Sequence, residues 1–177
     1  MRLPPLRWVV LPILLVPLAW LLFTGLGRDP RQIPSPLVGK PLPVLAGATL
    51  TGESFSSTSL LGTPFIVNAW ASWCIPACVD EHPVLMDAAS RYAGRLAVLG
   101  VLFQDTPDDA RRFLVRYGDG GWPHLLDSSG RLAVELGVTG PPETFFVDAD
   151  GIVIAKQIGP LTVETMAEYL ADLGLSE

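Results

Sequence analysis

Apolar residues in this chain form short continuous runs that alternate with segments of helical spacing. Two runs rich in β-branched residues, 64–70 (PFIVNAW) and 96–103 (LAVLGVLF), predict strands that are buried on both faces. Apolar positions three and four residues apart predict helices over residues 78–92, 106–117, 128–136 and 162–173. Residues 143–148 and 152–157 flank an Ala-Asp-Gly turn and predict a β-hairpin.

The order of these segments predicts the fold class. Strands alternate with helices, then a hairpin follows, and a helix closes the chain. Alternation of this kind favours parallel strands joined by helical crossovers, to which the hairpin adds antiparallel strands. We therefore expect an α/β fold with a mixed central sheet flanked by helices, which is the layout of thioredoxin-like proteins.

The first 27 residues have a different composition from the rest of the chain. Residues 8–27 contain no Asp, Glu, Lys or Arg, and about 20 apolar residues are enough to cross the hydrocarbon core of a bilayer. Arg2 and Arg7 precede this run, which favours a cytoplasmic N-terminus. A cleaved signal peptide is the alternative, although the apolar core is long and no small-residue cleavage site follows it. We expect residues 1–27 to form a single-pass transmembrane anchor in the lipid bilayer.

Composition also divides the remainder of the chain. Residues 28–43 are rich in proline and lack periodicity, so we interpret them as an extended tether between the anchor and a single domain over residues 44–177. The part after Gly27 holds 10 of the 12 basic residues and all 18 acidic residues, a net charge of −8. Because nucleic-acid binding depends on Lys and Arg that neutralise phosphates, we expect no nucleic-acid partner.

The only two cysteines lie where the first predicted strand leads into the next helix, with Cys74 at or just before the helix start and Cys78 one turn into it. The amino end of a helix stabilises an anion, so the Cys74 thiolate should be the attacking nucleophile and Cys78 the resolving thiol. Pro76 fits the first turn of such a helix. Two cysteines at this spacing could also be a buried apolar pair or half of a metal site. Trp73, directly before Cys74 at a strand-to-helix junction, favours redox chemistry.

Three segments carry a family resemblance: 68–74 (NAWASWC), 78–83 (CVDEHP) and 137–145 (GVTGPPETF). Over residues 34–172 the chain resembles the DsbE/CcmG-type thiol:disulfide interchange proteins of cytochrome c maturation. The resemblance implies a periplasmic domain anchored in the bacterial inner membrane. It also implies reduction of haem-site disulfides in apocytochrome c, a membrane electron donor of the DsbD/CcdA type, and no cofactor.

The resemblance assigns roles to individual residues. Cys74 and Cys78 would form the redox-active disulfide, and Pro142 would be a cis-proline beside it, although a Pro-Pro pair could simply stiffen a loop. Glu81 and Glu143 match family acids near the active site, where a partly desolvated carboxylate could accept the Cys78 proton. The alternative for Glu81 is an ordinary acid on the helix surface.

Two further expectations concern substrate contact and proton transfer. Trp73, Pro142 and Thr144 are expected to contact the substrate. Asn68 occupies the position where many thioredoxins carry a buried aspartate, so we expect that proton acceptor to be missing.

The spacing of the cysteines departs from the family, because three residues separate them instead of two. Residues four apart in a helix have Cα atoms about 6 Å apart, which still permits a disulfide. The same spacing occurs in Sco-type copper chaperones, which add a distant histidine, and two thiolates with an imidazole suit copper. The candidate histidines are His82, which we expect on the surface, and His124, which we expect to be structural.

Overall fold

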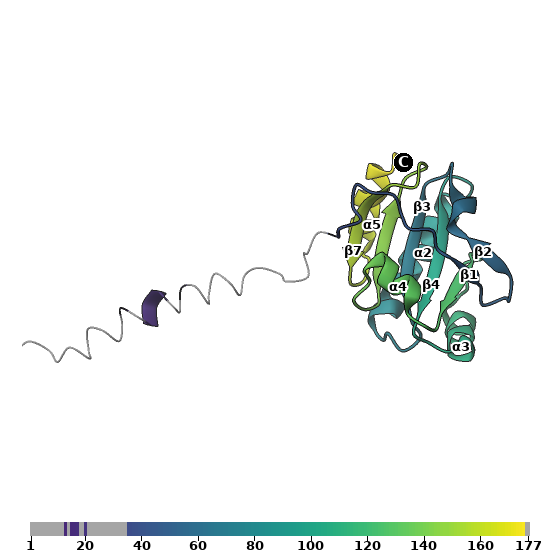
Figure 1. The fold of residues 1–177 in the computed structure, drawn as a ribbon, viewed down its shortest axis with the longest axis horizontal. Helices are drawn as coiled ribbons and strands as arrows, with labels where there is room; N and C mark the ends of the chain where they lie inside the picture. The colour runs from purple at the N-terminus through teal and green to yellow at the C-terminus, as the bar shows by residue number, and fades with distance from the viewer. Residues whose placement is uncertain (1–12, 14, 18–19, 21–34, 176–177) are drawn as a thin grey trace, which may run out of the picture. The chain divides into compact units, whose positions relative to one another are not determined.

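The structure of the chain is a computed structural model, and it describes residues 13, 15–17, 20 and 35–175. The chain divides into two units, Met1–Ile33 and Pro34–Glu177, and the second is the domain described below (Figure 1). Most of the predicted anchor, and residues 28–34 of the predicted tether, lie outside the described residues. Within the part that is described, no helix has both the length and the apolar character needed to cross a bilayer.

The centre of the domain is a five-stranded mixed sheet with the order β5-β4-β3-β6-β7. Strands β3 (Phe65–Trp70), β4 (Ala97–Phe103) and β5 (His124–Asp127) are parallel, whereas β6 (Glu143–Val147) and β7 (Val153–Ile158) add an antiparallel hairpin at the side of β3. The six residues of β3 are all buried, as expected of a central strand that is covered on both faces. The prediction of a mixed sheet flanked by helices is confirmed.

Helices cover both faces of this sheet (Figure 1). Leu85 of α2 (Ala77–Arg91) and Met166 of α5 (Val163–Asp172) pack with Ile66 on one face, where α3 (Pro107–Tyr117) also lies. Leu132 of α4 (Arg131–Leu136) packs with Val67 on the other face. Successive residues of a strand point to opposite faces, so β3 separates these two hydrophobic clusters.

Helix ends agree with the sequence where capping residues mark them. Thr106 caps α3, and its hydroxyl accepts a hydrogen bond from the Asp109 amide at 3.1 Å, with Pro107 in the first turn. Thr162 and Thr165 form a reciprocal capping box at the start of α5. These two helices therefore begin where their polar caps predict.

Residues 35–43 of the predicted tether are part of the domain. The Gly39 amide donates to the Val153 carbonyl and the Leu42 amide to the Gly151 carbonyl, at 2.8 and 2.9 Å. The side chains of Leu37 and Leu42 pack against the core on the α4 face. The folded domain therefore extends further toward the N-terminus than its proline content suggested.

The structure contains three short features that the apolar pattern did not predict. They are the strand β5, the hairpin of β1 (Ala46–Ala48) with β2 (Ser54–Ser56), and the 3₁₀ helix η1 (Ser57–Leu60) that follows the hairpin. β5 extends the sheet beyond β4 and is reached through α3.

Candidate active site

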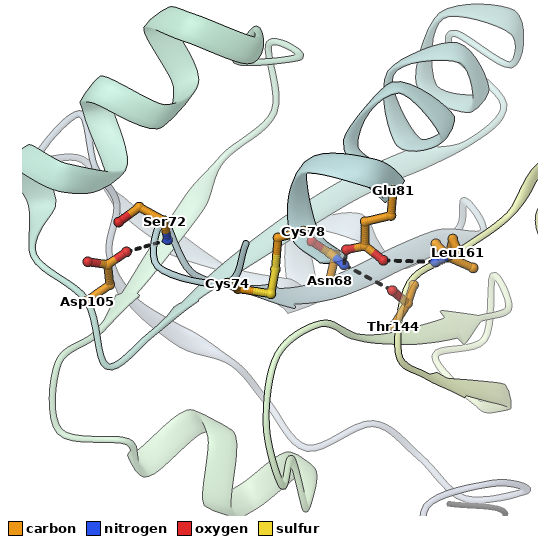
Figure 2. Close-up of a disulfide and its surroundings, with 8 residues drawn as sticks. All are labelled: Asn68, Ser72, Cys74, Cys78, Glu81, Asp105, Thr144 and Leu161. Atoms are coloured by element: carbon orange, nitrogen blue, oxygen red, sulfur yellow. Dashed lines mark hydrogen bonds between the residues drawn. A yellow bond between two sulfur atoms is a disulfide. The ribbon is translucent and has the colours of Figure 1, made fainter. Parts of the chain in front are cut away.

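Cys74 and Cys78 form a disulfide at the end of the sheet where the carboxyl end of β3 lies (Figure 2). Their Cα atoms are 5.4 Å apart, within the usual range for a disulfide, so three intervening residues are compatible with the bond although Cys74 lies outside the helix. Cys74 is 7% exposed and Cys78 is 2% exposed. The greater exposure of Cys74 agrees with its predicted role as the attacking sulfur.

Cys74, the predicted attacking cysteine, lies just before helix α2, which begins at Ala77. Pro76 is the N-cap of this helix rather than a residue of its first turn, and a proline side chain cannot accept a hydrogen bond. The positive end of the helix is therefore left to act on the Cys74 sulfur. The Cys78 amide donates to the Cys74 carbonyl at 2.9 Å, which ties the two cysteines together through the backbone. We expect this helix end to favour a thiolate at Cys74 once the disulfide is reduced.

A buried polar network lies beneath Cys78 (Figure 2). Glu81 is 1% exposed; one carboxylate oxygen accepts from Asn68 Nδ2 at 2.7 Å and the other from the Leu161 amide at 3.1 Å. Burial raises the pKa of Glu81 to about 7, and the hydrogen bonds from Asn68 and Leu161 act in the opposite direction. Cys78 and Glu81 are three residues apart on α2 and so share one face of the helix. The interpretation of Glu81 as a surface acid is wrong, and the desolvated carboxylate is confirmed.

Asn68, which occupies the position of the thioredoxin aspartate, also forms a hydrogen bond to β6. Its amide group also donates to the Thr144 hydroxyl at 3.0 Å, so it joins α2 to β6 through β3. Thr144 is fully buried. The prediction that Thr144 contacts the substrate is therefore wrong, because its side chain is enclosed within this network.

The loop before β6 lies beside the cysteines. Ala69 pairs with Glu143 in the sheet, so Pro142 and the loop before it emerge at the same end of the sheet as residues 71–74. The Pro141–Pro142 peptide bond is cis, as the resemblance implied. Glu143 is fully buried and forms an ion pair with Lys156 Nζ at 2.6 Å, while its other oxygen accepts hydrogen bonds from the loop. Lys156 was not among the predicted site residues.

The opposite side of the site is apolar and partly open to solvent. Trp73 is 54% exposed and Ile75 is 66% exposed, so both are available to a substrate chain. The Asp105 carboxylate accepts a hydrogen bond from the Ser72 amide at 2.6 Å and holds the segment that leads to Cys74. Asp105 lies just after β4, and its position after a buried parallel strand was the available signal for it.

The two histidines are both buried, so the expectation of a surface position for His82 is wrong. His82 Nε2 lies 2.7 Å from the Gly118 carbonyl, and burial lowers the pKa of His82. His124 Nδ1 accepts from Trp70 Nε1 at 3.1 Å, and burial lowers the pKa of His124 to about 4. The structural role expected for His124 is thus supported by its contacts. Among the described residues, no group of three or more His, Cys, Asp or Glu side chains is placed to hold a metal.

A disulfide between a buried strand and a helix, with a buried carboxylate and a cis-proline beside it, defines a thiol–disulfide oxidoreductase of thioredoxin-like fold. The Redoxin family model matches residues 37–173. DsbE from Allochromatium vinosum is 43% identical over 155 residues, which cover 86% of this chain and 84% of that protein. DsbE from Pseudomonas fluorescens biotype C is 36% identical over 168 residues, which cover 93% and 92%.

Solved structures agree with these relatives. DsbF from Mycobacterium tuberculosis superposes with a TM-score of 0.67 at 29% identity, covering 73% of this chain and 94% of that one. The chain belongs to the Redoxin family and, within it, to the DsbE/CcmG-type thiol:disulfide interchange proteins. It is accordingly a thiol–disulfide oxidoreductase.

Proposed function

We propose that this protein is a periplasmic dithiol reductant that reduces the haem-site disulfide of apocytochrome c during cytochrome c maturation. The single observation that carries the chemistry is the Cys74–Cys78 disulfide with the buried Glu81 on the same helix face. The particular substrate is supported by relatives that are named DsbE thiol:disulfide interchange proteins.

The proposed reaction passes two electrons from the protein to the substrate. The Cys74 thiolate attacks one sulfur of the substrate disulfide, which forms a mixed disulfide and releases one substrate thiolate that takes up a proton. Cys78 then loses its proton to Glu81 and attacks the Cys74 sulfur. This second step forms the Cys74–Cys78 disulfide and releases the second substrate thiolate, so the substrate is reduced and the protein is oxidised.

Glu81 suits the second step because its pKa of about 7 lies close to neutral pH. A carboxylate with such a pKa can accept a proton and return it to solvent within one cycle. The exposed Trp73 and Ile75 provide an apolar surface for the substrate chain around Cys74. Backbone groups of the loop before Pro142 would hold the substrate chain from the other side.

The proposed setting is the bacterial inner membrane, with residues 1–27 as a single-pass anchor and the domain in the periplasm. The apolar run over residues 8–27 and the two arginines before it support this orientation. A membrane electron donor of the DsbD/CcdA type would then return the protein to its dithiol form after each turnover.

A trapping experiment tests the substrate. The full chain with Cys78→Ser should form a stable mixed disulfide between Cys74 and disulfide-bonded apocytochrome c, because the resolving thiol is absent. Cys74→Ser is the matched control and should form none. Failure of the Cys78→Ser protein to capture apocytochrome c, while it still captures a short peptide disulfide, would show that the substrate is a different protein.

The reduction potential tests the direction of electron flow. We expect a value near the thioredoxin value of about −270 mV, whereas a value near about −120 mV would identify an oxidant.

A further inference from the structure

Lys156 and Glu143 form an ion pair that is almost completely removed from solvent. The Lys156 ammonium lies 2.6 Å from Glu143 Oε2, and the two side chains are 6% and 0% exposed. Phe145 pairs with Lys156 across the β6–β7 hairpin, so Glu143, two residues from Phe145, lies diagonally opposite Lys156 on the same face. Diagonal neighbours are within reach of long side chains, which explains how this pair forms.

Both Glu143 and Lys156 form hydrogen bonds to the loop of residues 137–142. Glu143 Oε1 accepts hydrogen bonds from the Thr139 amide at 2.8 Å, the Thr139 hydroxyl at 2.6 Å and the Gly140 amide at 3.2 Å. Lys156 Nζ donates to the Gly137 carbonyl at 2.9 Å. Two charges that attract each other therefore fix the start and the middle of one short loop.

This loop lies at the end of the sheet where Cys74 reacts. Ala69 pairs with Glu143, so the residues before Glu143 continue past the end of β3, next to the segment that leads to Cys74. Thr139 is exposed, and Gly140 and Pro141 are partly exposed. A substrate chain whose disulfide reaches Cys74 would pass over these residues.

We propose that Lys156 is a positioning residue for thiol–disulfide exchange, which acts with Glu143 to hold the 137–142 loop in the conformation that receives the substrate chain. This inference deepens the proposed function and rests on it. It assigns Glu143 a role in substrate alignment in place of proton transfer, since Oε1 accepts three hydrogen bonds from the loop and Oε2, which accepts no hydrogen bond, lies in the ion pair with Lys156. The network of Asn68 with Thr144 holds the next part of β6 from the opposite face of the sheet.

The test compares two reactions of the full-length reduced protein. One is reduction of a short peptide disulfide, which requires the substrate chain to be aligned, and the other is alkylation of Cys74 by iodoacetamide, which does not. Lys156→Met should raise the KM for the peptide disulfide by about tenfold, because small errors in substrate alignment are costly, with kcat within about twofold. The rate of Cys74 alkylation and its pH profile should remain those of the unmodified protein.

Two matched variants separate alignment from general damage. The double variant Glu143→Gln/Lys156→Met leaves no unpaired buried charge, and its amide oxygen can still accept from Thr139 and Gly140. Since neither the ion pair nor the hydrogen bond from Lys156 to Gly137 remains, its KM should stay close to that of Lys156→Met, which shows that the loss comes from the missing pair and not from an unpaired buried carboxylate. Lys156→Arg keeps the charge, so its KM should be closer to that of the unmodified protein than the KM of Lys156→Met is. It provides the comparison if Lys156→Met does not fold.

Three results would overturn the proposal. They are an unchanged KM in folded Lys156→Met, an equal loss in the peptide and iodoacetamide reactions, and a Glu143→Gln protein in which the pH profile of the resolving step shifts. If Lys156→Met does not fold, a KM for Lys156→Arg equal to that of a folded Glu143→Gln/Lys156→Met protein would overturn it as well. Because the peptide is not apocytochrome c, these outcomes are independent of whether apocytochrome c is the substrate.

Discussion

Replacement of Glu81 by glutamine removes the buried ionisable group beneath Cys78. In the folded protein burial raises the pKa of Glu81 from its ordinary value of 4.5 to about 7. The folded state therefore binds this proton more tightly than the unfolded state, so the free energy of unfolding falls as pH rises from 4.5 through 7. With these two pKa values, linkage gives a fall of about 2–3 kcal/mol between about pH 5 and pH 8 that is due to Glu81 alone.

The measurement is the free energy of unfolding by urea of the oxidised protein at the two pH values. Glu81→Gln lacks this titration. Relative to that of the unmodified protein, its free energy of unfolding should therefore rise by about 2–3 kcal/mol from about pH 5 to pH 8. Glutamine can accept only one of the hydrogen bonds from Asn68 and Leu161, but that cost is independent of pH and cancels in the comparison. The buried His82 and His124 titrate in both proteins and cancel as well.

Glu168→Gln is the matched control, because it makes the same chemical change at an exposed position on α5. The free energy of unfolding of Glu168→Gln should change with pH in the same way as that of the unmodified protein. If that of Glu81→Gln does so too, the carboxyl group is not desolvated in the folded protein and its assignment as the acceptor of the Cys78 proton loses its physical basis.

Three further changes test local features of the domain. Thr106→Ala removes the cap of α3, where the hydroxyl accepts from the Asp109 amide, and should lower the free energy of unfolding by about 1 kcal/mol in urea. Trp73→Ala should raise the KM for a peptide disulfide while the free energy of unfolding changes by less than about 0.5 kcal/mol, because Trp73 is 54% exposed. Asp105→Ala leaves the Ser72 amide without its acceptor and should lower the free energy of unfolding by about 1–3 kcal/mol; no change in thermal or urea unfolding would contradict that contact.

Features of the fold that depend on local chemistry could be predicted from the sequence. Thr106 with Pro107 marks the start of α3, and a buried apolar run marks β3. Both signals lie within a few residues of the element that they specify. The position of Cys74 just before α2 and that of Cys78 in its first turn followed from the same local pattern.

Features that depend on distant partners could not be predicted in this way. Strand β5 has only four residues and no alternation that separates it from a loop, and it is specified by pairing with β4. His82 looked like a surface residue because α3 and its Gly118 cap, which cover it, come much later in the chain. Lys156 was missed because a lysine in a strand normally faces solvent, and its buried partner lies on the neighbouring strand.

In the proposed cycle Cys74 attacks as a thiolate while Cys78 stays protected until the second step. Alkylation of the reduced protein by iodoacetamide across a pH series, with each cysteine followed separately by mass spectrometry, tests it directly. We expect Cys74 to react first, with a midpoint below the free-cysteine pKa of about 8.5, and Cys78 to react much more slowly. Equal rates at both cysteines, with a shared midpoint at about 8.5 or above, would contradict it.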